Sequence, residues 1–181
     1  MTLVELMVAS AVAGTVATAV LAFGLFSARS FTALGNYIDM HNGSRPALDL
    51  MVADIRQANG CSTSLTLSPV RLTLVGTNVV NSLPYTLTYS YDTNGLTLWR
   101  TYVDAHGSET KELLTGCTSF ALSYFQRNPT NGTYDVYPVD DPSHPDLCKL
   151  IQITWTCSRT ILGKPANSES VQSARVVIRK G

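Results

Sequence analysis

The hydrophobic pattern divides the chain into an apolar start, an amphipathic middle and an alternating remainder. Residues 6–28 contain no charged side chain and no histidine, and a run of about 20 such residues is long enough to cross a membrane as a helix. Beyond this run, apolar residues recur three and four positions apart, which is the period of a helical face. They form two stripes, both expected to pack on a sheet: Phe31, Leu34 and Ile38, then Leu48, Met51, Ile55 and Ala58.

These stripes continue the apolar run, so we predict one helix from about residue 2 to about residue 58. At about 1.5 Å per residue it would be roughly 85 Å long if straight. Gly43 and Pro46 fall between the stripes, and both residue types disfavour a helix interior. The sequence therefore predicts an interruption or kink there, with Pro46 in the first turn of the second half. Gly60 is a plausible stop.

From residue 61 onward the pattern alternates as in strands. Asn94-Gly95 lies between two alternating runs, which is a strong hairpin signal. Residues 128–146 hold four prolines and little apolar periodicity, so a surface loop is expected there. We predict an α+β fold in which the second half of the helix packs on an antiparallel sheet. Its strands are expected at residues 70–75, 85–91, 96–100, 120–125, 134–137, 150–155 and 176–179.

Composition narrows the function classes. Charged residues make up 14% of the 181 positions and the formal net charge is zero, so the sequence carries no strong nucleic-acid signal. It contains no dinucleotide-binding or phosphate-binding glycine motif and no recognisable nucleophile motif. We therefore expect no enzyme activity, no catalytic residues and no cofactor. Tyr85, Tyr89 and Tyr91 share one strand face, where sheet packing is more usual than a ligand platform.

The charges around the apolar run conflict with the cysteine content. No basic residue precedes the run and Arg29 follows it, so the positive-inside rule places the C-terminal domain in the cytoplasm. Four cysteines in that domain instead favour an oxidising compartment. The conflict disappears if a basic leader once preceded Met1 and was removed. We therefore expect Met1 to be a processed N-terminus.

The first nine residues, Met-Thr-Leu-Val-Glu-Leu-Met-Val-Ala, resemble the mature N-terminus of the type IV pilin superfamily. The usual first residue of the family is Phe, and here it is Met1. The resemblance implies cleavage by a prepilin peptidase and N-methylation of Met1. It also implies that Glu5 pairs with the N-terminal amine of a neighbouring subunit and so sets the register of a filament. Such a pair is strong in an apolar core because the dielectric constant there is low.

The resemblance also bears on helix flexibility and on subunit type. Gly14 matches a family position where the helix melts, but many major pilins have proline at position 22, and this chain has Ala22. The segments 54–58 and 174–179 resemble the larger minor pilins and the J-type minor pseudopilin. Three parts are thus expected: a transmembrane and filament-core helix at 1–28, its amphipathic continuation at 29–60, and a sheet domain at 61–181.

The cysteines are Cys61, Cys117, Cys148 and Cys157. Their spacing does not fit a zinc site, and no metal site is expected. Two disulfides are expected in an exported domain. Antiparallel pairing of the strands in the 120s and 150s would place Cys117 opposite Cys157, so we favour that bond, which leaves Cys61 with Cys148.

The expected function is that of a structural subunit of a type IV pilus or related filament, a minor pilin that primes assembly or sits at the tip. The alternatives are a minor pseudopilin of a type II secretion system, or an adhesive or DNA-uptake subunit. The expected partners are other pilin-like subunits, the prepilin peptidase, and the inner membrane before assembly. The C-terminal domain would be exported, and the subunit would then enter an extracellular pilus or a periplasmic pseudopilus.

Overall fold

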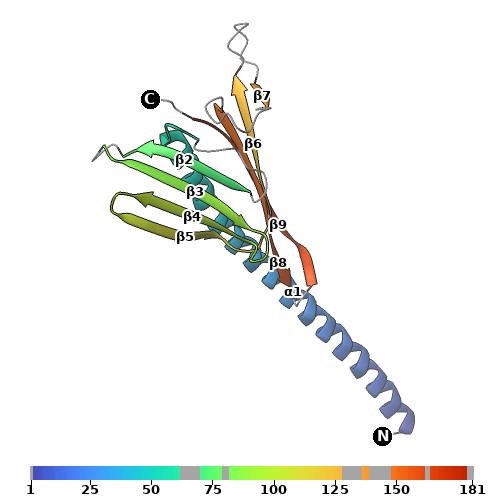
Figure 1. The fold of residues 1–181 in the computed structure, drawn as a ribbon. Coiled ribbons are helices and arrows are strands. Elements are labelled where there is room, and N and C mark those ends of the chain that lie inside the picture. The colour runs from blue at the N-terminus through green and yellow to red at the C-terminus, as the bar shows by residue number, and fades with distance from the viewer. Residues whose placement is uncertain are drawn as a thin grey trace.

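The chain forms one long helix that carries two antiparallel sheets on its C-terminal half (Figure 1). The computed structural model describes residues 2–61, 70–78, 82–127, 136–138, 148–161 and 164–178. The α+β class expected from the sequence is confirmed. Parts of the loop predicted at 128–146 lie outside the described residues, as do strand positions 134–135 and 179.

Helix α1 runs without a break from Leu3 to Gln57, which is 55 residues or about 80 Å. Thr2 caps its start, and Ala58 has extended backbone angles at its end. The interruption predicted near Pro46 is wrong, because Pro46 lies inside the continuous helix. Ser44 and Ala47, on either side of the proline, are buried, so packing against the sheets holds this part of the helix in place despite the lost backbone hydrogen bond.

The strands form two sheets rather than the single sheet expected, with orders β1-β2-β3-β4-β5 and β7-β6-β8-β9. All pairings are antiparallel. The strand bounds are β1 (Gly60–Cys61), β2 (Arg71–Thr77), β3 (Pro84–Asp92), β4 (Thr97–Asp104), β5 (Gly107–Leu114), β6 (Cys117–Arg127), β7 (Val136–Pro138), β8 (Leu150–Ile161) and β9 (Lys164–Val177).

The predicted hairpin at Asn94-Gly95 is confirmed as the turn between β3 and β4. Asp92 stabilises the turn, because its Oδ1 accepts a hydrogen bond of 2.9 Å from the Asn94 N–H. Leu96 takes a positive φ of 51° there, which is uncommon for a residue with a side chain. The following strand, β5, was not predicted, because its polar sequence gives no apolar alternation.

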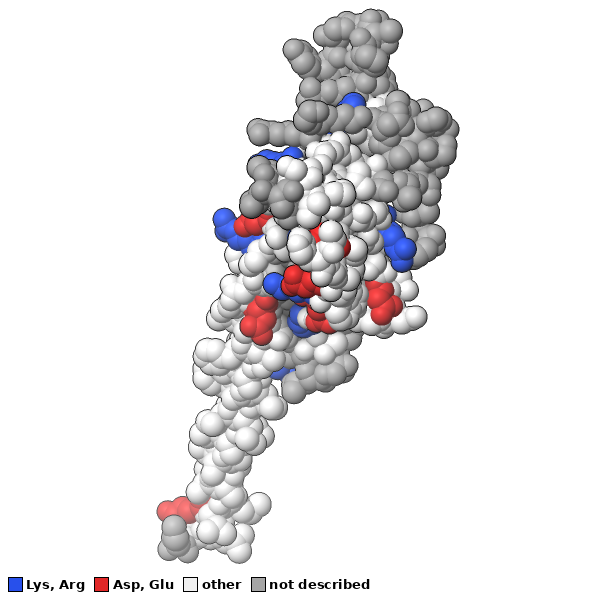
Figure 2. All heavy atoms as spheres, turned by 60° about the vertical axis from the view of Figure 1, so that its left-hand side comes forward, with Lys and Arg blue, Asp and Glu red and all other residues white. Residues whose placement is uncertain are grey.

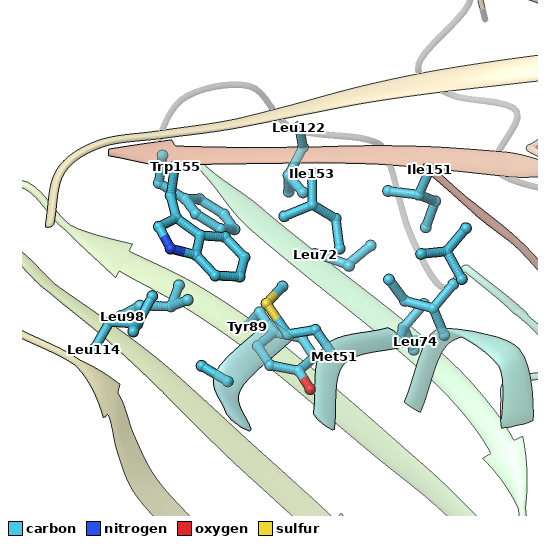
Figure 3. Packing of buried hydrophobic residues seen from close by; sticks show 14 of the residues in the cluster. Met51, Leu72, Leu74, Tyr89, Leu98, Leu114, Leu122, Ile151, Ile153 and Trp155 are labelled. Atoms are coloured by element: carbon cyan, nitrogen blue, oxygen red, sulfur yellow. The ribbon is translucent and has the colours of Figure 1, made fainter. Parts of the chain in front are cut away.

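The core lies where the second half of α1 meets both sheets (Figure 3). Met51 of the helix packs among side chains from strands β2, β3 and β8 (Figure 3). The helical stripe at 48–58 is confirmed as core-facing, with Met51, Ile55 and Ala58 fully buried. Trp155 is also fully buried, and its indole N–H has no hydrogen-bond acceptor among the described residues.

The prediction for the first stripe is wrong. Phe31, Leu34 and Ile38 were expected to dock on the sheet, but they are 75%, 57% and 48% exposed. Burial on the helix begins only at Met40. Asn36 marks the reach of the domain, because its side chain donates a 3.4 Å hydrogen bond to the Thr160 carbonyl near the end of β8. The sheets thus end too early along the helix to cover the first stripe.

Candidate functional site

The most unusual feature of the molecule is an uncovered apolar shaft, defined here as residues 3–38 of α1. Figure 1 shows its N-terminal part projecting alone from the sheet domain, and Figure 2 shows its surface almost free of charge except for an acidic group near the N-terminal tip. A monomer in water rarely exposes so large a contiguous apolar surface. Its exposed large side chains are Leu3, Val4, Leu6, Met7, Val8, Val12, Val16, Val20, Leu21, Phe23, Leu25, Phe26, Phe31, Leu34, Tyr37 and Ile38.

The shaft is suited to an apolar environment over more than a membrane's thickness. By length and composition, α1 qualifies as a membrane-crossing helix. The uncharged run at 6–28 spans about 35 Å, against about 30 Å for the hydrocarbon core of a bilayer. The whole shaft spans about 55 Å. A bilayer can therefore cover only part of it, and residues 31–38, in which Thr32 and Asn36 alternate with Phe31, Leu34, Tyr37 and Ile38, extend beyond.

Four hydroxyl groups of the shaft, those of Ser10, Thr15, Thr18 and Thr32, donate to carbonyls of the helix itself. Ser10 donates to the Met7 carbonyl at 2.9 Å, and Thr15 donates to the Val12 carbonyl at 2.8 Å. Thr18 donates to the Gly14 carbonyl at 3.0 Å. Such bonds let polar residues enter an apolar surrounding without an unpaired donor. The helix is continuous through Gly14, and an added Cβ there would contact nothing within 4 Å, so the flexibility expected at Gly14 stays a prediction.

Glu5 caps the helix to which it belongs. The Thr2 N–H donates to Glu5 Oε2 at 2.8 Å, and the Glu5 N–H donates to Thr2 Oγ1 at 3.4 Å. This reciprocal arrangement is a capping box, which satisfies two backbone donors and places a negative charge at the positive end of the helix dipole. The sequence analysis missed this role, although the Thr-x-x-Glu spacing signals it. Met1, the expected partner on a neighbouring subunit, lies outside the described residues.

At its other end, the helix is fixed to the five-stranded sheet by a charged network. Arg100 Nε donates to Asp54 Oδ2 at 2.9 Å, and Arg100 Nη2 donates to Asp54 Oδ1 at 3.3 Å. The Tyr89 hydroxyl donates to the same Asp54 carboxylate. Burial, together with the Asp54 charge, raises the pKa of Tyr89 far above its usual value. Tyr89 therefore stays protonated and keeps donating, and the network fixes the orientation of the last helical turn.

The four cysteines lie in the two pairs expected from the sequence. Cys117 and Cys157 are direct partners in the β6–β8 register, and a hydrogen bond links their thiols. A similar bond links Cys61 and Cys148. Directly opposed residues on antiparallel strands lie within the Cα separation that a disulfide requires, so bond formation stays a prediction that this geometry permits.

Cys157 has the most distinctive thiol environment. The hydrogen bond from Cys117 lowers the pKa of Cys157 to about 7, aided by the Ser44 hydroxyl and the positive charge of Arg159 and opposed by burial. The Ser44 oxygen lies 4.0 Å from Cys157 Sγ. The same Cys117–Cys157 hydrogen bond, with burial, raises the pKa of Cys117. Ser44 and Arg159 act on Cys157 and not on Cys117, so the thiolate is favoured on Cys157.

Within the part of the chain that the structure describes, no three His, Cys, Asp or Glu side chains gather in a group suited to a metal ion. Comparison with models of known protein families gives no match, and comparison with curated proteins gives none either. The findings that bear on classification are thus the fold itself and the helix: a long, apolar, membrane-length helix packed by its second half on antiparallel sheets, an arrangement compatible with a pilin-like fold.

Proposed function

We propose that this chain is a structural subunit of a type IV pilus or a related pilus-like filament, in the role of a minor pilin that primes assembly or sits at the tip. One observation carries the proposal. The exposed apolar shaft is about 55 Å long, whereas a bilayer covers about 30 Å. Apolar side chains beyond the membrane need another cover, and neighbouring copies of similar helices provide one.

A simple membrane anchor accounts for less of the shaft. An anchor needs about 20 apolar residues and a polar continuation. Here the continuation is mixed, because Arg29, Ser30 and Thr32 follow the uncharged run. Phe31 and Leu34 lie among them and are more than half exposed. In a filament the same surface packs helix against helix along its whole length. In the membrane-inserted subunit, residues 31–38 would remain exposed, which favours assembly.

Glu5 fits the proposal as a register device. In the single subunit its carboxylate is held by its own helix start. In a filament core, an amine of a neighbouring subunit would be a stronger partner, because charges attract more strongly in a low dielectric. Misaligned subunits would leave the carboxylate buried without that partner, which is costly. Proper axial alignment would thus be favoured.

The test compares two substitutions that affect the same helix start. Glu5→Ala removes the carboxylate and with it one bond of the capping box, whereas Thr2→Ala removes the other bond and keeps the carboxylate. We expect both variants to insert into the membrane fraction at the wild-type level. We expect the filament yield after shearing to fall severalfold for Glu5→Ala and to stay close to wild type for Thr2→Ala. An unchanged yield for Glu5→Ala, in a filament that depends on this subunit, contradicts the pairing role.

The type II secretion pseudopilus is the alternative filament. Deletion of the chain in its native host distinguishes the two: loss of surface pili with normal secretion supports the pilus, and loss of secreted enzymes with normal pili supports the pseudopilus. Under either proposal the sheet domain is exported across the inner membrane. The Cys117–Cys157 register, which permits a disulfide, and the nearness of Cys61 to Cys148 support that location.

A further inference from the structure

A cavity of about 320 Å³ opens beside the C-terminal end of α1, away from the shaft. The last helical turn contributes Asp54 to its lining, the end of β2 contributes Thr77 and Asn78, and β3 and β4 contribute Tyr85, Arg100 and Tyr102. This volume lies within the range of small-molecule sites. The sequence analysis placed Tyr85 on a sheet face and favoured packing for it, yet Tyr85 is only half-buried.

Two stacked tyrosine rings line this cavity. The rings of Tyr85 and Tyr102 are stacked, with centroids 5.3 Å apart and an angle of 28° between their planes. Gly76 of β2 fixes the position of Tyr85, because a Cβ added to Gly76 would lie 2.3 Å from atoms of that ring. The ring therefore lies against bare backbone on the neighbouring strand. The Gly76 backbone and the stacking therefore hold both rings in place in the absence of a ligand.

The charges in the lining cancel. Arg100 and Asp54 are paired through two hydrogen bonds, with side chains that are 17% and 15% exposed. The Arg100 guanidinium also lies 5.8 Å from the centroid of the Tyr102 ring. With one cation and one anion already matched, the cavity offers no surplus charge for a phosphate or an ammonium group. It offers hydrogen bonds: a carboxylate oxygen accepts two, and Asp54 Oδ1 accepts one from the described residues.

We propose that this cavity is a binding site for a neutral saccharide. A pyranose ring has an apolar C–H face that packs on aromatic rings and a rim of hydroxyls that need donors and acceptors. The half-buried Tyr102 ring, held against Tyr85, matches the first. The Asp54 carboxylate and the Thr77 hydroxyl, which also accepts a hydrogen bond from the Asn59 amide, match the second. The site goes beyond the proposed filament function and does not depend on it, because none of its residues belongs to the shaft.

The test uses the full chain in a detergent without a sugar headgroup, such as lauryldimethylamine oxide. Saturation-transfer NMR with neutral methyl glycosides of glucose, galactose, mannose and N-acetylglucosamine reports binding. We expect at least one glycoside to bind, Tyr102→Ala to weaken that binding about tenfold, and Tyr102→Phe to retain it. Trp99→Ala is the matched control, because Trp99 lies on the same strand but alternates to the opposite sheet face, and it should bind as the wild type does.

Three results would overturn the proposal: no binding of any neutral glycoside, equal loss in Tyr102→Ala and Trp99→Ala, or tighter binding of adenosine monophosphate than of every glycoside. If Tyr102→Ala does not fold, Gly76→Ala replaces it. That change displaces the Tyr85 ring while leaving every lining side chain present, and it should weaken binding similarly. Filament yield should be normal in each folded variant, so failure of this site and failure of the filament function are distinguishable.

Discussion

Cys157 differs from the other cysteines because a cationic side chain and a hydroxyl both act on its sulfur. Arg159 and Ser44 add to the hydrogen bond from Cys117, and together they bring the pKa of Cys157 to about 7. Arg159 is itself held by the Thr115 carbonyl at 2.7 Å. A thiol with an ordinary pKa near 8.5 is mostly protonated at neutral pH. A larger fraction of Cys157 than of an ordinary cysteine would therefore be thiolate at neutral pH.

This environment predicts how disulfide formation depends on pH. Thiolate, not thiol, attacks an oxidant, and ionisation of Cys157 increases as pH rises through its pKa. The rate of Cys117–Cys157 bond formation in the reduced protein should therefore rise with a midpoint near pH 7. Timed oxidation with oxidised glutathione, acid quenching and non-reducing peptide mapping measure this rate.

Arg159→Gln removes the cation and should move that midpoint to higher pH. Arg175→Gln is the matched control, because Arg175 is bonded to Gln152 on the same sheet and is not among the groups that shift the pKa of Cys157. A wild-type midpoint near 8.5, the value of an ordinary cysteine, would be inconsistent with the surroundings described for Cys157.

Some residue-level features followed from the sequence and others did not. The Cys117–Cys157 register was predictable, because two apolar alternating runs in antiparallel pairing bring these positions together. The Thr2–Glu5 capping box was equally visible as a spacing but was overlooked. The Asp54–Arg100 pair joins residues 46 positions apart. Nothing local marks such a pair, because it exists only once the helix end and β4 are placed together.

At the level of elements, the two halves of α1 differ in what covers them. Both halves carry apolar residues at helical spacing, so the sequence pattern predicts the same packing for both. The structure buries Met51 completely and leaves Leu34 57% exposed. Periodicity identifies an apolar face but does not say whether the same chain, a lipid or another subunit covers it. This is why the first stripe was misassigned and the second was not.

The contrast yields a paired prediction. Met51→Ala leaves a cavity among side chains of α1 and both sheets and should lower the free energy of unfolding by about 2–5 kcal/mol. Leu34→Ala removes a similar number of atoms from an exposed position and should change it by less than about 0.5 kcal/mol. Chemical denaturation of the full chain in detergent, followed by circular dichroism, gives both values.

Assembly should respond in the opposite order. Leu34→Ala should lower the sheared-filament yield while leaving the fold intact, since Leu34 belongs to the proposed contact surface. A large loss of fold stability in Leu34→Ala would show instead that the domain itself covers this part of the helix. It would then remove the basis for assigning the shaft to assembly.

The strands show the same limit of sequence patterns. The hairpin at Asn94-Gly95 was predictable because turn chemistry is local. Strand β5 was not, because it is the edge of its sheet and six of its eight residues are exposed. An edge strand rich in charged and polar side chains resists pairing with other chains, and that composition also hides it from an apolar pattern. The division into two sheets likewise depends on long-range packing.

The whole molecule combines a core that its own chain covers with an apolar surface that its own chain leaves exposed. Helix α1, both sheets and the charged pair at the helix end form a closed packing unit around Met51 and Trp155. Among the described residues, the shaft is packed by nothing comparable, and its bond to the domain is that of Asn36 to the Thr160 carbonyl (Figure 1). The molecule is thus a sheet domain on a long apolar shaft, and the shaft needs a lipid or protein surrounding to cover it.

The measurement that tests the proposed filament function most directly is photo-crosslinking from the shaft in the native host. A benzoylphenylalanine placed at Phe31, which is 75% exposed and lies beyond the uncharged run, should crosslink to another filament subunit in the sheared-filament fraction. The same probe at Glu109 on edge strand β5 serves as the control and should give much less of that product. If the probe at Phe31 yields no protein crosslink in the sheared-filament fraction, or reacts only with lipid, the shaft is a membrane anchor and the proposed filament function is contradicted.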